Sequence, residues 1–265
     1  MQDLGIREEI REFKNRKWVV KNRTTLKEKD LGKGADWGKR AAKGFLASGI
    51  DPADRGGHKN DYIDLLQKKA LEEVIELKGN EFVLDFGCGS GRVAYWIAPR
   101  VKKVLGLEVT QEMIELAEKN RTVENVEFML YDGVHFPVLP YLFDLILSVG
   151  VLQTMKGEIL ENTVSQLANY LKGGGRLYLI EQVSDNPKVN RPSGKEYLEA
   201  FKESNLECLQ YYPIRSGRWW LLYLIRYGMV PKRWFHRIAH YELTKRKEEK
   251  GSIRFYKDFL FMLEK

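Results

Sequence analysis

Apolar residues in the middle of the chain occur in short continuous runs, and the segments between the runs repeat their apolar positions at helical spacing. The runs are rich in Val, Leu, Ile and Phe, which is typical of strands buried on both faces of a sheet. Such alternation predicts an α/β fold with a doubly wound, Rossmann-like parallel sheet. We predict strands over residues 82–86, 103–107, 126–130, 143–148 and 176–180, and helices over 110–119 and 161–171.

The residues before the first strand are patterned differently. Residues 62–77 have a helical period that stops at Gly79, whereas residues 1–60 are charged, weakly patterned and interrupted by glycine. We expect residues 1–60 to form an N-terminal helical cap or lid segment and residues 61–265 to form the main domain.

The tail contains a long insert. A helix over 195–204 and a strand over 206–212 precede it, and a closing strand over 253–263 follows it. Pro231 divides the insert into two helical halves, because proline cannot continue a helix that precedes it. We therefore predict a helical insert, residues 214–250, between the last two strands.

The net charge of +7 over 265 residues is distributed unevenly. Residues 1–50 sum to +6, residues 51–210 to −7 and residues 211–250 to +7, so an acidic middle lies between two basic segments. Such basic segments attract anionic partners: a phosphorylated substrate, a nucleic acid or an anionic membrane face. The alternative is a solvated helix pair whose aromatic residues form core. The insert and its approach carry Tyr211, Tyr212, Trp219, Trp220, Tyr223, Tyr227, Trp234, Phe235 and Tyr241.

Composition excludes several classes of protein. The longest apolar run, Trp219–Ile225, is far shorter than the roughly 18 residues of a membrane span. The sequence holds 2 cysteines and 4 scattered histidines, which argues against a disulfide framework and against a structural zinc site. We expect a cytoplasmic protein without a metal, and peripheral contact with a membrane stays open.

The strongest signal is the sequence V-L-D-F-G-C-G-S-G-R over residues 83–92, a buried strand that runs into Gly87, Gly89 and Gly91. Glycines let the backbone turn sharply and approach a flat ligand closely. A dinucleotide-binding turn needs G-x-G-x-x-G, but Arg92 occupies the position of its third glycine. Asp85 would repel a pyrophosphate, whereas it suits a ligand that carries an ammonium and a sulfonium.

Polar residues follow the next strands as well. Glu108 ends the second strand, where a carboxylate can accept hydrogen bonds from both ribose hydroxyls. Asp132 and Gly133 follow the third strand, and Asp132 is placed to accept a bond from an adenine amino group. Ser148 ends the fourth strand, where the strand order of the sheet should reverse.

In the order and spacing of these motifs, residues 60–181 resemble class I S-adenosylmethionine-dependent methyltransferases of the small-molecule type. The resemblance implies a seven-stranded sheet with an antiparallel last strand and S-adenosyl-L-methionine as cofactor. It also implies that the methionine part of the cofactor lies among Asp85, Gly87, Cys88, Gly89 and Gly91, that Glu108 holds the ribose, that Val109, Asp132 and Gly133 lie at the adenine, and that Ser148 lies near the amino acid moiety.

The resemblance leaves the catalytic residues unknown. Many members have a histidine shortly after the fourth strand, where this chain has Gln153, so no general base is carried over. Gln153 is kept as a substrate-side candidate. Tyr62, just before the first helix of the core, is a candidate lid residue, and its alternative role is packing at the start of that helix.

Three functions are consistent with the sequence. The first is methylation of an oxygen or nitrogen of a small-molecule or sugar- or lipid-linked acceptor, with the insert contacting an anionic substrate or a membrane surface. The second is RNA methylation, with the basic flanks binding phosphates and the aromatics stacking on bases. The third is a cofactor-binding protein without catalysis. Residues 148–151, S-V-G-V, do not match the N-P-P-Y run of amino-methylating base enzymes, and no glutamate pair of the protein arginine type follows the strand.

Overall fold

A computed structural model describes residues 36–265, apart from 134, 218, 250–252 and 254. Residues 1–35 of the predicted cap lie outside the described residues. The described chain forms a seven-stranded sheet in the order β3-β2-β1-β4-β5-β7-β6. The strands are β1 (Phe82–Phe86), β2 (Lys103–Glu108), β3 (Val126–Leu130), β4 (Phe143–Val149), β5 (Leu171–Val183), β6 (Glu207–Ser216) and β7 (Lys257–Glu264).

The first five strands are parallel, and β7 pairs antiparallel with both β5 and β6. The predicted Rossmann-like sheet with an antiparallel last strand is therefore confirmed. Its order reverses between β1 and β4, so the carboxyl ends of these two strands border a crevice, which is where open α/β sheets bind their ligands. Because β6 runs parallel to β5, the insert leaves the sheet at this same carboxyl edge.

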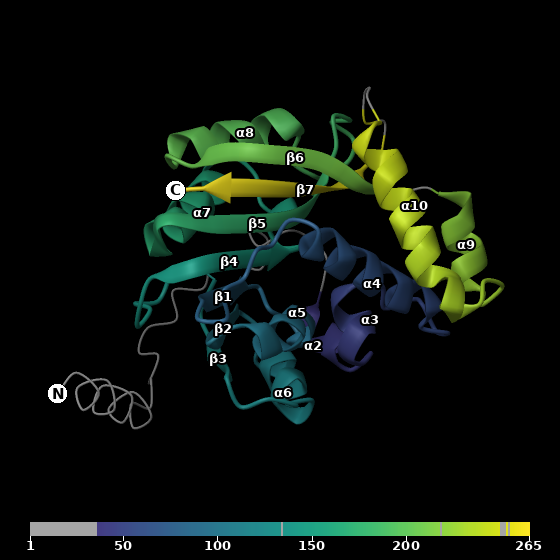
Figure 1. The fold of residues 1–265 in the computed structure, drawn as a ribbon, viewed down its shortest axis with the longest axis horizontal. Helices are drawn as coiled ribbons and strands as arrows, with labels where there is room; N and C mark the ends of the chain where they lie inside the picture. The colour runs from purple at the N-terminus through teal and green to yellow at the C-terminus, as the bar shows by residue number, and fades with distance from the viewer. Residues whose placement is uncertain (1–35, 134, 218, 250–252, 254) are drawn as a thin grey trace.

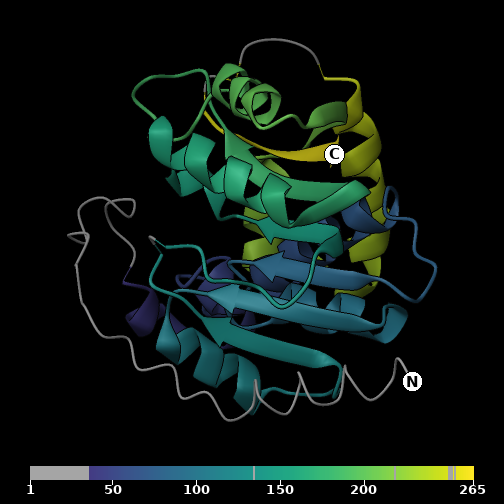
Figure 2. The ribbon, with the colours of Figure 1, turned by 90° about the vertical axis from the view of Figure 1, so that its left-hand side faces the viewer.

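Helices cover both faces of the sheet (Figure 2). One hydrophobic core lies beneath α4 and α5 and continues under the insert, and it includes Leu66, Ile97 and Ile225. The second core lies beneath α7 and α8 and includes Val164 and Phe201. The helices are α4 (His58–Glu72), which precedes β1, and α5 (Arg92–Ile97), α6 (Gln111–Lys119), α7 (Glu158–Tyr170) and α8 (Gly194–Glu203), which lie between strands.

Two short helices, α2 (Trp37–Ala41) and α3 (Phe45–Gly49), form the described part of the predicted cap. The insert consists of α9 (Trp220–Arg226), a 3-10 turn η3 (Lys232–Trp234) and α10 (Phe235–Lys247). Pro231 immediately precedes η3 and separates the two helices, as the sequence predicted. Figure 1 shows α3, α4, α9 and α10 gathered at the carboxyl edge of the parallel strands.

A buried polar cluster joins the insert to the main domain. The Tyr62 hydroxyl of α4 donates a 2.7 Å hydrogen bond to the Glu242 carboxylate of α10, and both side chains are inaccessible to solvent. Arg246 lies 3.6 Å from Glu242. Arg215 of β6 forms a buried ion pair with Asp258 of β7, at 2.7 and 3.0 Å. Buried charges persist only when they are paired, so this cluster fixes how the insert docks on α4.

Within residues 36–265, outside the gaps named above, no helix is both long enough and apolar enough to cross a membrane.

Candidate active site

The glycine turn connects β1 to α5 at the carboxyl edge of the sheet. The backbone N–H groups of Gly87 and Cys88 both donate to the Leu107 carbonyl, at 2.7 and 3.1 Å, so the turn continues the pairing of β1 with β2. Gly87 has φ of +68°, and a Cβ there would lie 2.3 Å from a methyl group of Val151. Gly87 therefore has to be glycine for both backbone conformation and space.

Asp85 lies two residues before this turn and is almost completely buried. Its Oδ2 atom is buried and has no hydrogen-bond partner among the described residues. Burial raises the pKa of its carboxyl group to about 7, although the charge of Arg92 and the backbone N–H of Ala94 oppose this increase. A buried carboxylate oxygen without a partner is costly and therefore indicates a missing cationic or donor group.

Glu108 ends β2 beside the turn. One carboxylate oxygen accepts the Gly89 N–H at 2.9 Å, and the other accepts the N–H groups of Val109 and Thr110 at 2.8 and 3.0 Å. Burial raises the pKa of Glu108, and these backbone donors counteract that increase. The sequence placed Asp85 and Glu108 at neighbouring strand ends, and the structure brings both to the same turn.

The residues predicted at the adenine lie farther out on the same edge. Val109 and Asp132 are exposed, and Gly133 has φ of +78°. The Asp132 carboxylate accepts the His135 N–H at 2.7 Å and lies 2.8 Å from His135 Nδ1. The Asp132 carboxylate therefore already has a partner, His135. A ligand that binds Asp132 would either displace His135 or share the carboxylate with it.

The carboxyl ends of β4 and β5 meet in a polar cluster that the sequence analysis missed. Glu181 of β5 is inaccessible to solvent and accepts hydrogen bonds from the Ser148 hydroxyl and from the N–H groups of Val151 and Gln153, at 3.2, 3.1 and 3.0 Å. The Gln153 side chain accepts the Gln182 N–H at 3.0 Å. The signal was present, because an acidic residue directly follows the apolar run 176–180, as Glu108 follows the second strand.

Glu181 acts on the glycine turn through Val151. Its carboxylate holds the backbone that presents the Val151 side chain to Gly87. Burial raises the pKa of Glu181 to about 7, while its backbone donors from Gln153, Val151 and Leu152 and the Ser148 hydroxyl oppose this increase. These bonds hold Ser148 and the backbone of Val151 and Gln153 in place at the carboxyl ends of β4 and β5.

Cys88 and Tyr62 are both enclosed by protein. Cys88 is buried in the turn, and burial followed by the charges of Asp85 and Glu108 raises the pKa of its thiol well above the usual value. Tyr62 packs on Trp219 and Phe235 and donates its hydroxyl to Glu242. In this arrangement neither side chain faces solvent, and the predicted contact of Tyr62 with substrate stays a prediction.

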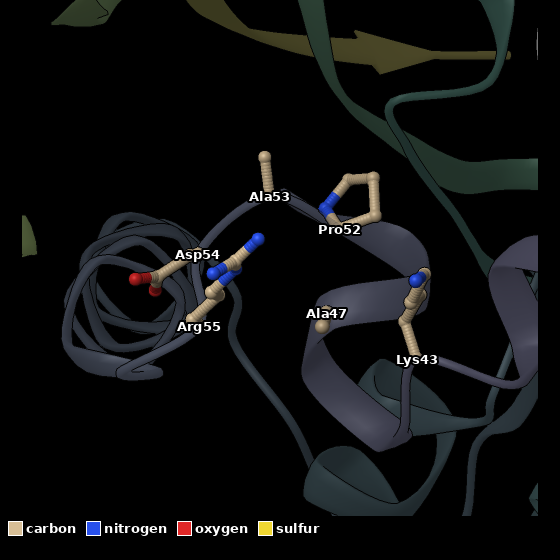
Figure 3. A pocket seen from close by; sticks show the side chains of 6 residues that line it. All are labelled: Lys43, Ala47, Pro52, Ala53, Asp54 and Arg55. Carbon is tan, nitrogen blue, oxygen red and sulfur yellow. The ribbon is translucent and has the colours of Figure 1, made fainter.

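The described part of the cap contacts the glycine turn. The Ser90 hydroxyl donates a 2.5 Å hydrogen bond to the Phe45 carbonyl of α3, and the Phe45 ring stacks on Tyr95 of α5. Outside this contact lies a hollow of about 480 Å³ between α3 and the start of α4 (Figure 3). Its lining includes the cations Lys43 and Arg55, which form no ion pair with another described residue, and Ala53, whose carbonyl accepts a 2.7 Å bond from Arg226 of α9.

Residues 83–175 match the family model described as a methyltransferase domain. This match covers the glycine turn and the carboxyl ends of β1, β2, β3 and β4. Residues 83–175 carry a methyltransferase domain, and the sheet has the class I fold. S-adenosyl-L-methionine is the cofactor of this class, as the sequence resemblance implied. Within the described residues, no group of His, Cys, Asp or Glu side chains is arranged to hold a metal ion.

Some relatives of the methyltransferase domain are named for the molecule that they methylate, and others are not. The chain is 37% identical over 84 residues to a protein named uncharacterized RNA methyltransferase from Clostridium tetani, covering 31% of this chain and 18% of that protein. It is 28% identical over 141 residues to Methyltransferase GfsG from Streptomyces halstedii, covering 51% of this chain and 48% of that protein. The chain thus spans less than half of these relatives.

Solved structures share the fold. Geranyl diphosphate C-methyltransferase from Streptomyces coelicolor aligns with a TM-score of 0.61 and 14% identity, covering 91% of this chain and 98% of that one. An S-adenosylmethionine-dependent methyltransferase from Mesorhizobium loti aligns with a TM-score of 0.55 and 13% identity, covering 76% and 98%. At these identities the likeness establishes the fold of the methyltransferase domain and nothing about its acceptor.

Proposed function

We propose that the whole chain transfers a methyl group from S-adenosyl-L-methionine to an oxygen or nitrogen of a small-molecule or sugar- or lipid-linked acceptor. The main support for the cofactor site is the buried Oδ2 atom of Asp85 beside the glycine turn, which has no hydrogen-bond partner among the described residues. The residues fit the cofactor, because Asp85 and Glu108 give the turn negative charge and Gly89 has no atom within 4 Å of a Cβ built on it.

The proposed binding roles follow from chemistry. Asp85 stabilises the positive charges of the methionine part, and Glu108 accepts bonds from the ribose hydroxyls in exchange for its present bond from Gly89. Val109, Asp132 and Gly133 contact the adenine, and Ser148 lies near the amino acid moiety. When bound, S-adenosyl-L-methionine supplies an electrophilic methyl group on a sulfonium. The protein has to hold the acceptor in line with that methyl and exclude water.

The acceptor site is proposed between the cap and the insert. The described part of the predicted cap, residues 36–60, closes the site over the glycine turn, and the bond from Ser90 to Phe45 supports this role. Residues 61–265 form the catalytic domain. The hollow is lined by two cations, Lys43 and Arg55, and by one carboxylate, Asp54, and this excess of positive charge supports an acceptor with an anionic group. Peripheral membrane contact of residues 214–250 is developed below.

RNA methylation is the alternative acceptor class, supported by the names of relatives such as the Clostridium tetani protein and a mouse tRNA (uracil-5-)-methyltransferase homolog, 41% identical over 61 residues. Attack on a pyrimidine ring would need an accessible cysteine nucleophile. Cys88 is buried in the glycine turn, and Cys208 lies on β6, where burial raises the pKa of its thiol. These positions argue against methylation of a pyrimidine ring carbon through a cysteine adduct.

Calorimetry tests the cofactor site. We expect S-adenosyl-L-methionine to bind the full chain, and we expect Asp85→Asn and Glu108→Gln each to weaken binding by about 10- to 100-fold, which is the value of a hydrogen bond to a charged group. Glu127→Gln is the matched control, because Glu127 is a half-exposed carboxylate on the neighbouring strand β3 that pairs with Lys103.

The result can contradict the proposal in two ways. Equal affinity of all three variants would remove Asp85 and Glu108 from the site. Binding of a phosphate-bearing dinucleotide in place of S-adenosyl-L-methionine would overturn the proposed cofactor role itself. Once binding is shown, mass spectrometry of metabolite extracts incubated with labelled cofactor identifies the acceptor.

A further inference from the structure

Large apolar and aromatic side chains lie exposed along the outer side of the insert. Trp220, Tyr223 and Tyr227 follow one another at intervals of three and four residues, so they share one face of α9. Trp220 is 68% exposed and Tyr227 is 75% exposed. The opposite face of α9 carries Leu222 and Ile225, which are buried. The sequence alternative, that the aromatics of the insert form core, therefore fails for this face.

The connection from α9 to α10 extends the same surface. Met229 and Trp234 are both more than half exposed, and Tyr241 is exposed about two turns farther along, on α10. We call Trp220, Tyr223, Tyr227, Met229, Trp234 and Tyr241 the aromatic surface. Six large apolar or aromatic side chains are thus at least half exposed on the insert, and large exposed apolar groups gathered on one element indicate a partner surface.

The charge around the aromatic surface is almost entirely positive. Residues 217–247 contain eight Lys or Arg residues and a single carboxylate, Glu242. Glu242 is buried and accepts the Tyr62 hydroxyl, so it adds no negative charge to the outside. Arg233 and Arg237 are exposed and form no ion pair with another described residue. The partner of this surface therefore has to be both apolar and anionic.

The surface is held firmly in place. Arg226 binds the Asp51 carboxylate at 3.3 Å, Lys232 pairs with Asp61, and Lys247 pairs with Glu73 at 2.6 Å. These contacts tie three points of the insert to α4 and to the loop before it. The aromatic surface consequently points away from α4 while its buried face stays docked.

We propose that the aromatic surface docks on an anionic lipid bilayer. Tryptophan and tyrosine favour the boundary between the headgroups and the hydrocarbon, and arginine and lysine nearby bind anionic headgroups. Because the insert leaves the carboxyl edge of the sheet, docking brings that edge to the membrane. Delivery of a lipid-linked acceptor to the site by this docking rests on the proposed function, whereas the docking itself does not.

The balance of apolar and cationic residues favours a bilayer over a nucleic acid. Affinity for nucleic acids comes mainly from many phosphate contacts. On the insert, the exposed apolar and aromatic residues outnumber the cations that form no ion pair with another described residue. The Met229 side chain can neither stack on a base as an aromatic ring does nor bind a phosphate. A bilayer uses both kinds of side chain.

Vesicle co-sedimentation of the full chain tests the proposal. We expect binding to vesicles with about one quarter phosphatidylglycerol to exceed binding to phosphatidylcholine vesicles by about tenfold or more. Trp220→Ser with Tyr223→Ser and Tyr227→Ser should abolish binding at any salt concentration. Arg233→Glu with Arg237→Glu should remove the preference for anionic lipid.

Controls separate the surface from general effects. Val138→Ser removes an apolar side chain that is 81% exposed outside the insert, and Lys119→Glu with Lys188→Glu changes the net charge as much as the arginine pair, on exposed residues outside the insert. Both should bind vesicles as the unmodified protein does. All variants should keep the melting temperature and the affinity for S-adenosyl-L-methionine, so failure here is distinct from failure of the methyltransferase proposal.

Three outcomes would overturn the docking proposal. The first is an unmodified protein that binds neither kind of vesicle. The second is RNA binding with a steep salt dependence that the serine variant loses, without vesicle binding. The third is a dimer in light scattering that the serine variant dissociates, which would make the aromatic surface an interface between two copies of the chain.

Discussion

At the scale of single residues, the carboxyl group of Asp85 combines a cost to folding with a use in binding. Burial raises its pKa from 3.8 to about 7. Between these values the folded protein keeps a proton that the unfolded chain releases, so the free energy of unfolding falls as the pH rises through this window. The proposed cofactor contact at Oδ2 thus comes at a cost in stability above this window.

We predict that Asp85→Asn stabilises the protein above pH 7. The amide carries no charge, so the variant avoids the cost of an ionised buried carboxylate, and the gain is at most a few kcal/mol. Near pH 4 the two proteins should be equally stable. Urea unfolding at both pH values measures the difference, and a variant less stable than the unmodified protein at high pH would contradict it.

Asp144 provides the opposite case as a control. Burial raises the pKa of Asp144, but its bonds from Lys172 and from the Phe82 N–H lower it more, so the pKa is lowered overall. Its contribution to stability is present above the unfolded pKa and is lost as the pH falls. Asp144→Asn should therefore destabilise the protein at high pH.

Cofactor binding should also depend on pH through Asp85. A cation placed beside Oδ2 favours the ionised carboxylate, so binding releases a proton wherever the free protein is protonated. We expect the affinity for S-adenosyl-L-methionine to fall by about tenfold per pH unit below about pH 7, and we expect Asp85→Asn to lose most of this dependence. Calorimetry in buffers of different ionisation enthalpy measures the released proton. A pH-independent affinity of the unmodified protein would count against Asp85 as the cationic contact.

At the scale of elements, the turn between β1 and α5 depends on the turn after β4. Val151 fills the space beside Gly87, and the Glu181 carboxylate holds the backbone of Val151. Two loops from different strand ends therefore form one wall of the crevice. Disturbing either loop should disturb the other.

We predict that Gly87→Ala destabilises the protein by about 2–4 kcal/mol, because the new Cβ overlaps Val151 and the residue needs a positive φ. Gly89→Ala is the matched control: its φ is +53°, but nothing lies within 4 Å of the added Cβ, so only about 1–2 kcal/mol should be lost. Adding Val151→Ala should restore part of the stability of Gly87→Ala. Equal losses for both glycines in thermal unfolding would show that the overlap does not matter.

The sequence predicted the strands well because buried parallel strands are continuous apolar runs. The predicted strand at 82–86 is β1 exactly as bounded, and Pro231 divides the insert as expected. The cluster around Glu181 was missed because its bonds join β5 to residues about thirty positions away, at the end of β4 and in the loop that follows it. The contact of Tyr62 with Glu242 spans 180 positions, and no local pattern encodes such a pairing.

At the scale of the whole molecule, the insert is attached to the catalytic domain by buried polar contacts as well as by core packing. Tyr62 supplies a contact from α4, and Oε1 of Glu242 has no hydrogen-bond partner among the described residues. The orientation of the aromatic surface relative to the cofactor site depends on this junction.

Tyr62→Phe should lower the free energy of unfolding by about 1–3 kcal/mol, since it leaves the second oxygen of a buried carboxylate without its donor. Tyr223→Phe is the control, because the Tyr223 hydroxyl is on an exposed side chain and its loss should be neutral. Denaturant unfolding of the two variants measures the contrast. A stable Tyr62→Phe variant would mean that the junction is held by packing alone.

The antiparallel course of β7 has a practical consequence. Because β7 runs against β5, Lys265 leaves the sheet at the end opposite to Asp85, Glu108 and the insert. An affinity handle or fluorophore fused after Lys265 therefore projects from the side of the sheet opposite to the crevice. A protein immobilised by that handle leaves the crevice and the exposed Trp220 and Trp234 accessible to ligands or vesicles in solution.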